Sequence, residues 1–306
     1  MMTGRLYIDG KDVYADFGLW VVEGGYNDIV AFPPLKTVKS NDWQEDDGIE
    51  ADLSAPVLNT RDVSIKFVVW GGNKDGLGAL IDLLSDKAYH TFYCATLRRK
   101  YRLRLVSHPN LEWAVRLGFT TLKFADDFPL DDYTYQPPVS GIKPYGDYSL
   151  DDKLLTDYGV RVLQGSLASI DKSPEVKRNL LRNINTHSGA IYDDARVTYK
   201  SKEVQIKCLM RAATIEEFWR NHDALLYDLV RPDERRLFVD ARGVEYPCHY
   251  KSCKTDDFAN DDGRVWWQFT LTLVFTHYRL KGKRPALRLV SEGALRLMSN
   301  GNLRLT

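Results

Sequence analysis

The sequence predicts a mainly β protein with one helix in each of two repeats, and two observations support this fold class. Residues Asp16 to Gly24 have a counterpart 141 positions later, Asp157 to Gly165, and the same offset relates Val63–Lys66 to Val204–Lys207. Several long segments also alternate between apolar and polar residues, as strands with one buried face do. A repeat this long indicates duplicated whole domains, because solenoid repeats are roughly 20–50 residues long.

Each repeat is predicted to contain a strand followed directly by an amphipathic helix. Residues 63–70 and 204–210 alternate and are rich in β-branched side chains, which favours a strand with one polar face. The apolar residues that follow are spaced as on one face of a helix, at Leu77, Leu80, Ile81 and Leu84 and again over 215–229. Thr214 with Glu217 is typical of a helix start, and Pro232 marks the stop. Packing against the repeat's own sheet explains this stripe better than a ligand groove does.

Further strands are predicted after each helix. Residues 93–107 align with 238–252 at an offset of 145, so the extra residues of the second repeat fall around its helix. Each repeat then closes on an alternating strand, over 115–124 in the first and 265–275 in the second. We expect two tandem β-sandwich or barrel domains that arose by internal duplication.

These patterns divide the chain into four segments. They are domain 1 (residues 1–126), a Pro-, Asp- and Tyr-rich linker (127–149), domain 2 (150–279) and a C-terminal Leu-Arg-Leu repeat (280–306). Proline removes amide donors and favours extended backbone, so the linker is predicted to be a connector of fixed reach. The tail is too short to fold alone and is expected to pair with a sheet edge of its own chain or of a neighbour.

The composition excludes several classes of protein. Lys and Arg together number 42, as do Asp and Glu, so the net charge is zero and a general affinity for nucleic acid is not expected. No apolar run approaches the roughly 20 residues that span a bilayer, and the start of the sequence has no signal-peptide pattern. We therefore expect no membrane insertion and synthesis in a cytoplasm.

The sequence predicts no catalytic, cofactor-binding or metal site, and therefore no enzyme and no cofactor. It has no phosphate loop, no His-Glu-x-x-His and no Gly-x-Ser-x-Gly motif. Cys94 and Cys208 are predicted to be buried thiols within strands, and Cys248-His249 with Cys253 lacks a second pair of ligands at finger-like spacing. The residues shared by the repeats are of the packing or turn-forming kind, and no polar cluster is repeated.

Two groups of polar residues are candidate sites. His222 lies within the helical stripe, where packing is favoured over a role as a base. Four acidic pairs could be calcium-binding turns or glycosidase carboxylates but are predicted to be solvated loop tips. These pairs are Asp46-Asp47, Asp126-Asp127, Asp193-Asp194 and Asp261-Asp262.

The order of elements resembles a known family. A β domain with a flanking helix, entered by Asp-aromatic-Gly, resembles the tail-tube domain of tailed bacteriophages and related injection machines. Residues 80–84 followed by Phe92-Tyr93 are similar to the N-terminal half of phage distal tail proteins. The resemblance covers residues 4–278. Distal tail proteins usually continue with a carbohydrate-module-like domain, whereas this chain has a second tube-like copy instead. That difference favours a baseplate hub or adaptor.

The resemblance implies a structural role without catalysis. Three or six chains would form a ring that joins the tail tube to the tail tip of a phage, prophage or phage-like particle. The ring would contact other tail and baseplate proteins, pass DNA only as cargo and close its unpaired sheet edges. The protein would assemble in the bacterial cytoplasm and end in the virion tail.

Two alternatives stay open from the sequence. A tandem carbohydrate-binding β-sandwich would use exposed aromatic residues such as Trp20, Trp43 or Trp113 as stacking platforms. A hydrolase would need a polar site that forms only on folding, such as an open cleft with two facing carboxylates.

Overall fold

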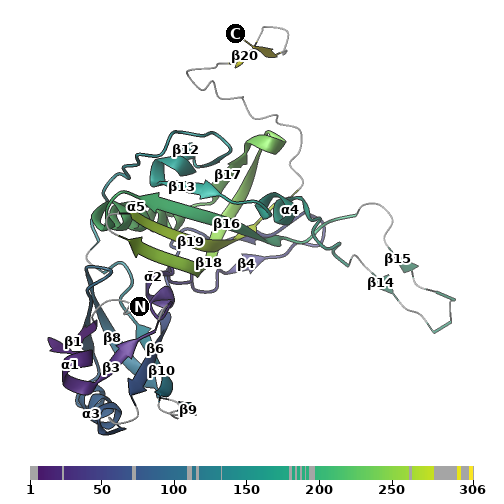
Figure 1. The fold of residues 1–306 in the computed structure, drawn as a ribbon. Coiled ribbons are helices and arrows are strands. Elements are labelled where there is room, and N and C mark those ends of the chain that lie inside the picture. The colour runs from purple at the N-terminus through teal and green to yellow at the C-terminus, as the bar shows by residue number, and fades with distance from the viewer. Residues whose placement is uncertain are drawn as a thin grey trace.

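The structure is a computed structural model of the chain and is mainly β, with few helices and two large antiparallel sheets (Figure 1). We refer to residues 6–126 as the first half and to residues 148–278 as the second half. The structure describes residues 6–22, 24–70, 74–108, 112–114, 117–131, 133–178, 181–182, 185–186, 188–189, 191–192, 197–261, 264–278, 295–297 and 303–305.

The first sheet contains eight strands in the order β2-β1-β7-β8-β10-β6-β3, with β9 paired to β10. The two longest strands of this sheet contain the predicted alternating segments 63–70 and 117–124, and residues 115 and 116 lie outside the described residues. The strands are β1 (Leu6–Ile8), β2 (Lys11–Asp12), β3 (Leu19–Val21), β6 (Arg61–Trp70), β7 (His90–Cys94), β8 (Arg99–Ser107), β9 (Glu112–Ala114) and β10 (Leu117–Asp126).

The second sheet contains seven strands in the order β12-β11-β17-β18-β19-β16-β13, which repeats the order of the first sheet. Small separate pairs are formed by β4 (Ser40–Asn41) with β5 (Glu50–Ala51), β14 (Leu181–Arg182) with β15 (Ile191–Tyr192), and β20 (Leu295–Leu297) with β21 (Leu303–Leu305). The strands of the second sheet are β11 (Tyr148–Leu150), β12 (Lys153–Leu154), β13 (Val160–Val162), β16 (Lys202–Ala212), β17 (Arg235–Val239), β18 (Val244–Asp261) and β19 (Arg264–Phe275).

Each half has one long helix, as predicted, and shorter helices that the sequence pattern did not reveal. The long helices are α3 (Lys74–Ser85) and α5 (Ile215–Leu229). The Thr214 hydroxyl accepts the Glu217 N–H at 3.1 Å, which confirms the predicted start of α5. The shorter elements are α1 (Val13–Phe17), α2 (Asn27–Val30), α4 (Ser166–Asp171) and the 3₁₀ turns η1 (Leu155–Tyr158) and η2 (Asp240–Arg242). No helix among the described residues is long and apolar enough to cross a membrane.

The repeat extends to the register of the strands. Leu19 pairs with Val69 in the first sheet, and Val160 pairs with Met210 in the second, so both partners shift by 141 residues. The glycines that end α1 and η1, Gly18 and Gly159, have φ angles of +67° and +72°. Glycine adopts this left-handed conformation without steric cost, which explains the repeated Asp-aromatic-Gly.

A β-bulge also recurs. In the first sheet the pairing of β8 with β10 skips Val106, and in the second the pairing of β18 with β19 skips Lys251. These residues lie 145 positions apart, the offset found in the sequence for this region. A bulge leaves one residue outside the ladder and bends the strand, so both sheets bend at the same place.

The outer edges of β6 and β16 are covered within the chain. The Asp28 carboxylate in α2 accepts the Ser64 N–H at 3.1 Å, and the Ser169 hydroxyl in α4 accepts the Gln205 N–H at 2.9 Å. Both donors and both acceptors are 141 residues apart. A short helix of the same chain therefore covers this part of each strand edge.

A hairpin arm leaves each half and is repeated in register. The first arm (residues 33–59) carries the bridge Leu35–Leu58 and the strands β4 and β5. The second arm (residues 174–200) carries the bridge Val176–Tyr199 and the strands β14 and β15. All of these pairs are related by an offset of 141 residues.

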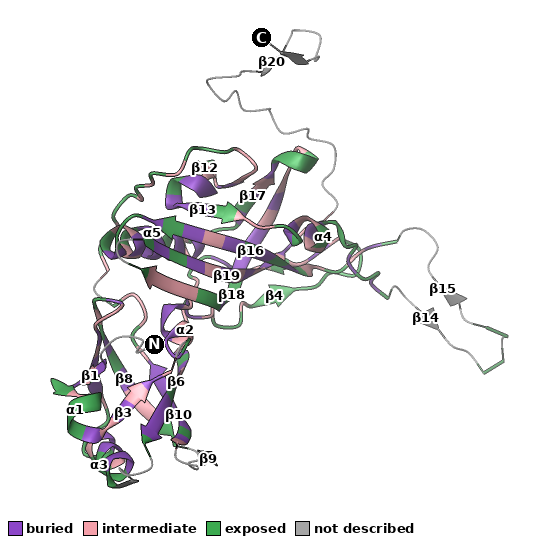
Figure 2. Ribbon diagram, viewed as in Figure 1, coloured by how far each residue is buried: buried purple, intermediate pink, exposed green. Residues whose placement is uncertain are grey.

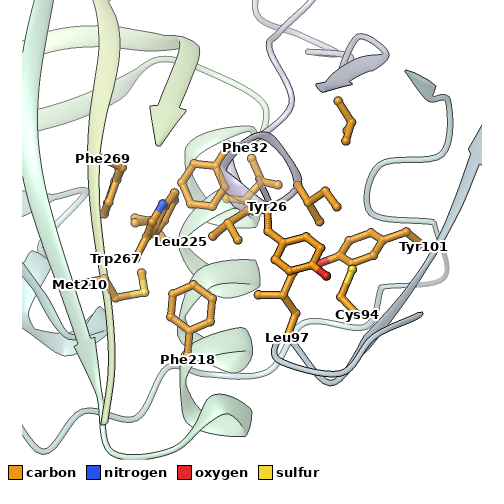
Figure 3. Packing of buried hydrophobic residues seen from close by; sticks show 14 of the residues in the cluster. Tyr26, Phe32, Cys94, Leu97, Tyr101, Met210, Phe218, Leu225, Trp267 and Phe269 are labelled. Atoms are coloured by element: carbon orange, nitrogen blue, oxygen red, sulfur yellow. The ribbon is translucent and has the colours of Figure 1, made fainter. Parts of the chain in front are cut away.

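Buried residues alternate with more exposed ones along the long strands (Figure 2). Figure 3 shows where the two halves meet, with Phe32 from the first half inserted among second-sheet residues. Its ring centroid lies 5.1 Å from that of Trp267, which is fully buried. The residue at the Trp267 position in the first sheet is Gly118, so the second core has room for larger side chains there.

The linker lies along α5. Asn221 holds the backbone of Val139 through two hydrogen bonds of 2.8 Å, and the Tyr135 hydroxyl donates to the Asp228 carboxylate at 3.2 Å. Within the tail, β20 pairs with β21, and most of the other tail residues lie outside the described part.

Candidate functional site

A cleft with many polar and charged lining residues lies between the two halves. It has a volume of 490 Å³ and lies between β8, α5 and the start of the linker. Its lining includes Arg61, Arg99, Tyr101, Asp126, Trp219 and Asp223.

One ion pair links the halves across this cleft. Arg99 Nη1 in β8 lies 3.0 Å from both carboxylate oxygens of Asp223 in α5, and the guanidinium lies 4.5 Å from the Trp219 ring. His222 Nδ1 lies 2.9 Å from Asp223 Oδ1, and its Nε2 lies 2.9 Å from the Val30 carbonyl of the first half. His222 is therefore a buried residue of the junction, in agreement with its predicted packing role.

The charges around Asp223 keep it ionised. Burial alone would raise the pKa of this carboxyl, but the hydrogen bond and charge of His222 and those of Arg99 outweigh it, and the pKa lies below its ordinary value. A carboxylate with a lowered pKa does not donate a proton near neutral pH.

Asp126 forms a second ion pair at this cleft. Its carboxylate contacts the Arg61 guanidinium, whose Nη1 donates to the carbonyls of Ile29 and Ala31 at 2.6 and 3.1 Å. Asp127 accepts two bonds from Arg104 and one from Thr60. The prediction of a solvated loop tip at Asp126-Asp127 is wrong, because both carboxylates bind cations that are remote in the sequence.

These contacts determine what the cleft can do. A hydrolase would need two carboxylates that face an open space with one of them able to donate a proton. Asp126 and Asp223 are each bound by an arginine, so the geometry supports a joint between the halves and does not support acid–base chemistry.

One polar contact is repeated, contrary to the prediction that the repeats share no polar cluster. The Asp9 carboxylate accepts the Thr91 N–H at 2.9 Å, and the Asp151 carboxylate accepts the Arg236 N–H at 2.8 Å. Each also binds a cationic or imidazole side chain beside it, at His90 and Arg235. Both aspartates have a positive φ, so this contact fixes a turn against a neighbouring strand.

The first arm lies across the second sheet. Its Leu35 N–H donates to the Lys251 carbonyl at 2.9 Å, and Ile49 N–H donates to the Thr276 carbonyl at 2.9 Å. Gly48 approaches so closely that a Cβ would lie 1.7 Å from the Thr276 oxygen, which excludes any side chain there.

The tip of the first arm ends on the base of the second arm. Lys177, only 2% exposed, donates from Nζ to the carbonyls of Trp43 and Gly48 at 2.7 and 2.6 Å and pairs with Asp42 at 2.5 Å. A buried ammonium needs such acceptors because its desolvation is costly. This lysine locks the first arm in place.

The four cysteines are free thiols, and three of them are buried. Cys94 and Cys208 are buried within β7 and β16, as predicted. Cys248 is also buried and Cys253 is half-buried. Among the described residues, no group of three or more His, Cys, Asp or Glu side chains could hold a metal ion.

The tryptophans considered as glycan platforms lie on different elements. Trp20 is half-buried in β3 and packs edge-on against Tyr14, with centroids 5.9 Å apart. Trp43 is 53% exposed on the first arm and donates from Nε1 to Glu50 at 3.1 Å. The side chain of Trp113, like Asp193-Asp194, lies outside the described residues.

Sequence reasoning missed the junction ion pairs and the arms. Arg99 and Asp223 are 124 residues apart, and no local pattern relates them. The arms did leave a signal, since Pro33, Lys36 and Gly48 recur at the same offset of 141 as Pro174, Lys177 and Gly189.

Fold and junction together define a duplicated, mainly β protein whose two antiparallel sheets are joined by an arm and by ion pairs. No family model matches the sequence, and no curated protein matches it. Among solved structures, the chain is similar to SPP1 Dit (gp 19.1), described as a paradigm of the hub adsorption apparatus in phages that infect Gram-positive bacteria. The two share 13% sequence identity and a TM-score of 0.33 over 88% of this chain and 97% of that chain.

Proposed function

We propose that this chain is a structural component of a phage or phage-like tail or baseplate and forms a ring that joins the tail tube to the tail tip. The observation that carries this proposal is the repetition of sheet order, register, bulge, edge cover and arm in both halves. Every repeated feature shapes or joins sheets. A chain with two such units supplies two ring-building units.

In this proposal the chain has two ring-forming domains, a linker and a tail. Residues 1–126 and 150–279 are the two tube-like domains, 127–149 the linker and 280–306 the tail. Three or six chains form the ring, which contacts other tail and baseplate proteins, carries no catalytic site and passes DNA without gripping it. Zero net charge is compatible with such a lumen. Assembly takes place in the bacterial cytoplasm, and the product is part of the virion tail.

The mass of the protein in solution tests this function. We expect sedimentation velocity at micromolar concentration to show a species of three or six times the chain mass of 35.1 kDa, and negative-stain images to show rings. A monodisperse monomer that forms no ring alone or with its tail partners would contradict the proposal.

A further inference from the structure

We propose that the second arm of one chain lies across the first sheet of a second copy, as the first arm lies across the second sheet within the chain. This inference rests on the proposed function, because it identifies the contact through which copies would join. The inference starts from two observations. The two arms have the same internal strand register, and the first arm is hydrogen-bonded to the second sheet of its own chain.

The second arm stands apart from both sheets. Figure 1 shows β14 and β15 to the right of the second sheet, whereas the first sheet lies at the lower left. The first arm instead crosses from the first half and is held along the second sheet by Leu35, Gly48 and Ile49. A second copy can therefore offer the second arm a surface that its own chain does not.

The bulge in the first sheet supplies the first part of that surface. Leu35 N–H donates to the carbonyl of the bulge residue Lys251, and the equivalent pair is Val176 N–H with the bulge residue Val106. Among the described residues, Val176 N–H has no hydrogen-bond partner. The side chains of Val106 and Val176 are 53% and 47% exposed, so two apolar groups would be covered together.

A lysine supplies the second part. Lys177 binds the carbonyls of the first arm's tip, and its equivalent at the base of the first arm is Lys36. Lys36 is exposed, and its Nζ has no partner among the described residues. Gly189 has a φ of +88°, close to the +80° of its equivalent Gly48, so the backbone at this position is left-handed in both arms.

Contacts of this kind join copies head to tail. The arm and its receptor surface are different parts of the chain, so the contact is heterologous and generates a ring when the rotation closes. The junction ion pair is not repeated, because the residue equivalent to Arg99 is Val244. The contact between copies would therefore depend mainly on the arm, whereas the contact between the two halves of one chain also has the Arg99–Asp223 ion pair.

Matched lysine variants of the full chain test the proposal. Lys36→Met should leave the thermal midpoint of the monomer unchanged and weaken association by on the order of tenfold or more, because a charge-assisted hydrogen bond is lost only between copies. Lys177→Met should lower the midpoint, because it removes a buried contact within the chain. Sedimentation velocity and thermal unfolding read out both effects.

A mixing experiment tests the direction of the contact. One variant has residues 181–192 replaced by Gly-Gly and so lacks the second arm, and the other, Lys36→Met with Val106→Asp, lacks the receptor. Each should be a folded monomer alone. Together they should form a 1:1 dimer and nothing larger, because one intact arm meets one intact receptor.

The outcomes separate the two proposals. If the unaltered chain forms rings and both variants still assemble as it does, the arm contact is overturned while the proposed function stands. The arm contact is also overturned if the variant that lacks the receptor, Lys36→Met with Val106→Asp, assembles alone. That result would indicate that copies join through identical surfaces. If the unaltered chain stays monomeric with and without its tail partners, both proposals fail.

Discussion

Arg99 Nη1 lies 3.0 Å from both carboxylate oxygens of Asp223, although the two residues belong to different halves of the chain. This pair shows how the two sheets are fixed relative to each other. Asp223 is buried, and Arg99 also lies over the rings of Tyr101 and Trp219. The Arg99 guanidinium is thus positioned by stacking on two aromatic rings as well as by its attraction to the Asp223 carboxylate.

Replacement of this carboxylate should loosen the junction. We expect Asp223→Asn to lower the free energy of unfolding by about 2 kcal/mol, because a charged partner of Arg99 and of His222 is lost from a buried position. Urea unfolding measures the change. Glu216→Gln is the matched control, since Glu216 also pairs with an arginine of the first half but is 66% exposed and should have no measurable effect. Equal losses in the two variants would contradict a special role for the buried pair.

The Asp9 turn should make stability depend on pH. Burial opposes ionisation of Asp9, but hydrogen bonds from Thr91, His90 and Lys87 outweigh it and lower its pKa to about 2. The unfolded carboxyl binds a proton at higher pH than the folded one, so the stability that Asp9 contributes is present above about pH 4 and is lost as the pH falls towards 2. We expect Asp9→Asn to flatten the fall of the thermal midpoint between pH 5 and pH 2.5, relative to the unaltered chain. A parallel fall in both proteins would refute this.

Adjacent tryptophans in β19 should differ sharply in importance. Trp267 is fully buried, stacks on Phe269 at 3.8 Å and donates from Nε1 to Thr255. We expect Trp267→Ala to cost about 3–5 kcal/mol by chemical denaturation, because it leaves a cavity. Trp266 is 42% exposed, so Trp266→Ala should cost less than about 0.5 kcal/mol and serves as the control.

Two glycines should respond to alanine in opposite directions. Gly159 has a φ of +72°, and a Cβ there would lie 2.5 Å from the Arg211 carbonyl oxygen, so Gly159→Ala should cost about 2 kcal/mol or more. Gly78 lies in α3 with nothing within 4 Å of an added Cβ. Gly78→Ala should therefore raise stability by about 0.5 kcal/mol, because it reduces the freedom of the unfolded chain. The two thermal midpoints should move apart, and a shift of both in one direction would count against this account.

The sequence by itself determined the duplication, the long strands and both long helices. Alternation along 63–70 and 265–275 and the apolar spacing of 215–229 are local properties, and local hydrophobic periodicity decides which elements form. The buried positions of Cys94 and Cys208 followed from the same alternation. The short helices α2 and α4 were missed because four to six residues carry no periodic signal.

Only the tertiary structure decided which remote groups meet. Asp126 was expected in solvent, but Arg61 lies directly opposite it on the neighbouring strand β6, and Arg99 meets Asp223 across the junction. The fate of the two arms was decided in the same way, since nearly equivalent hairpins occupy different surroundings. The physical reason is that contacts between residues 65 and 124 positions apart depend on how strands and whole sheets pack, which no short stretch of sequence encodes.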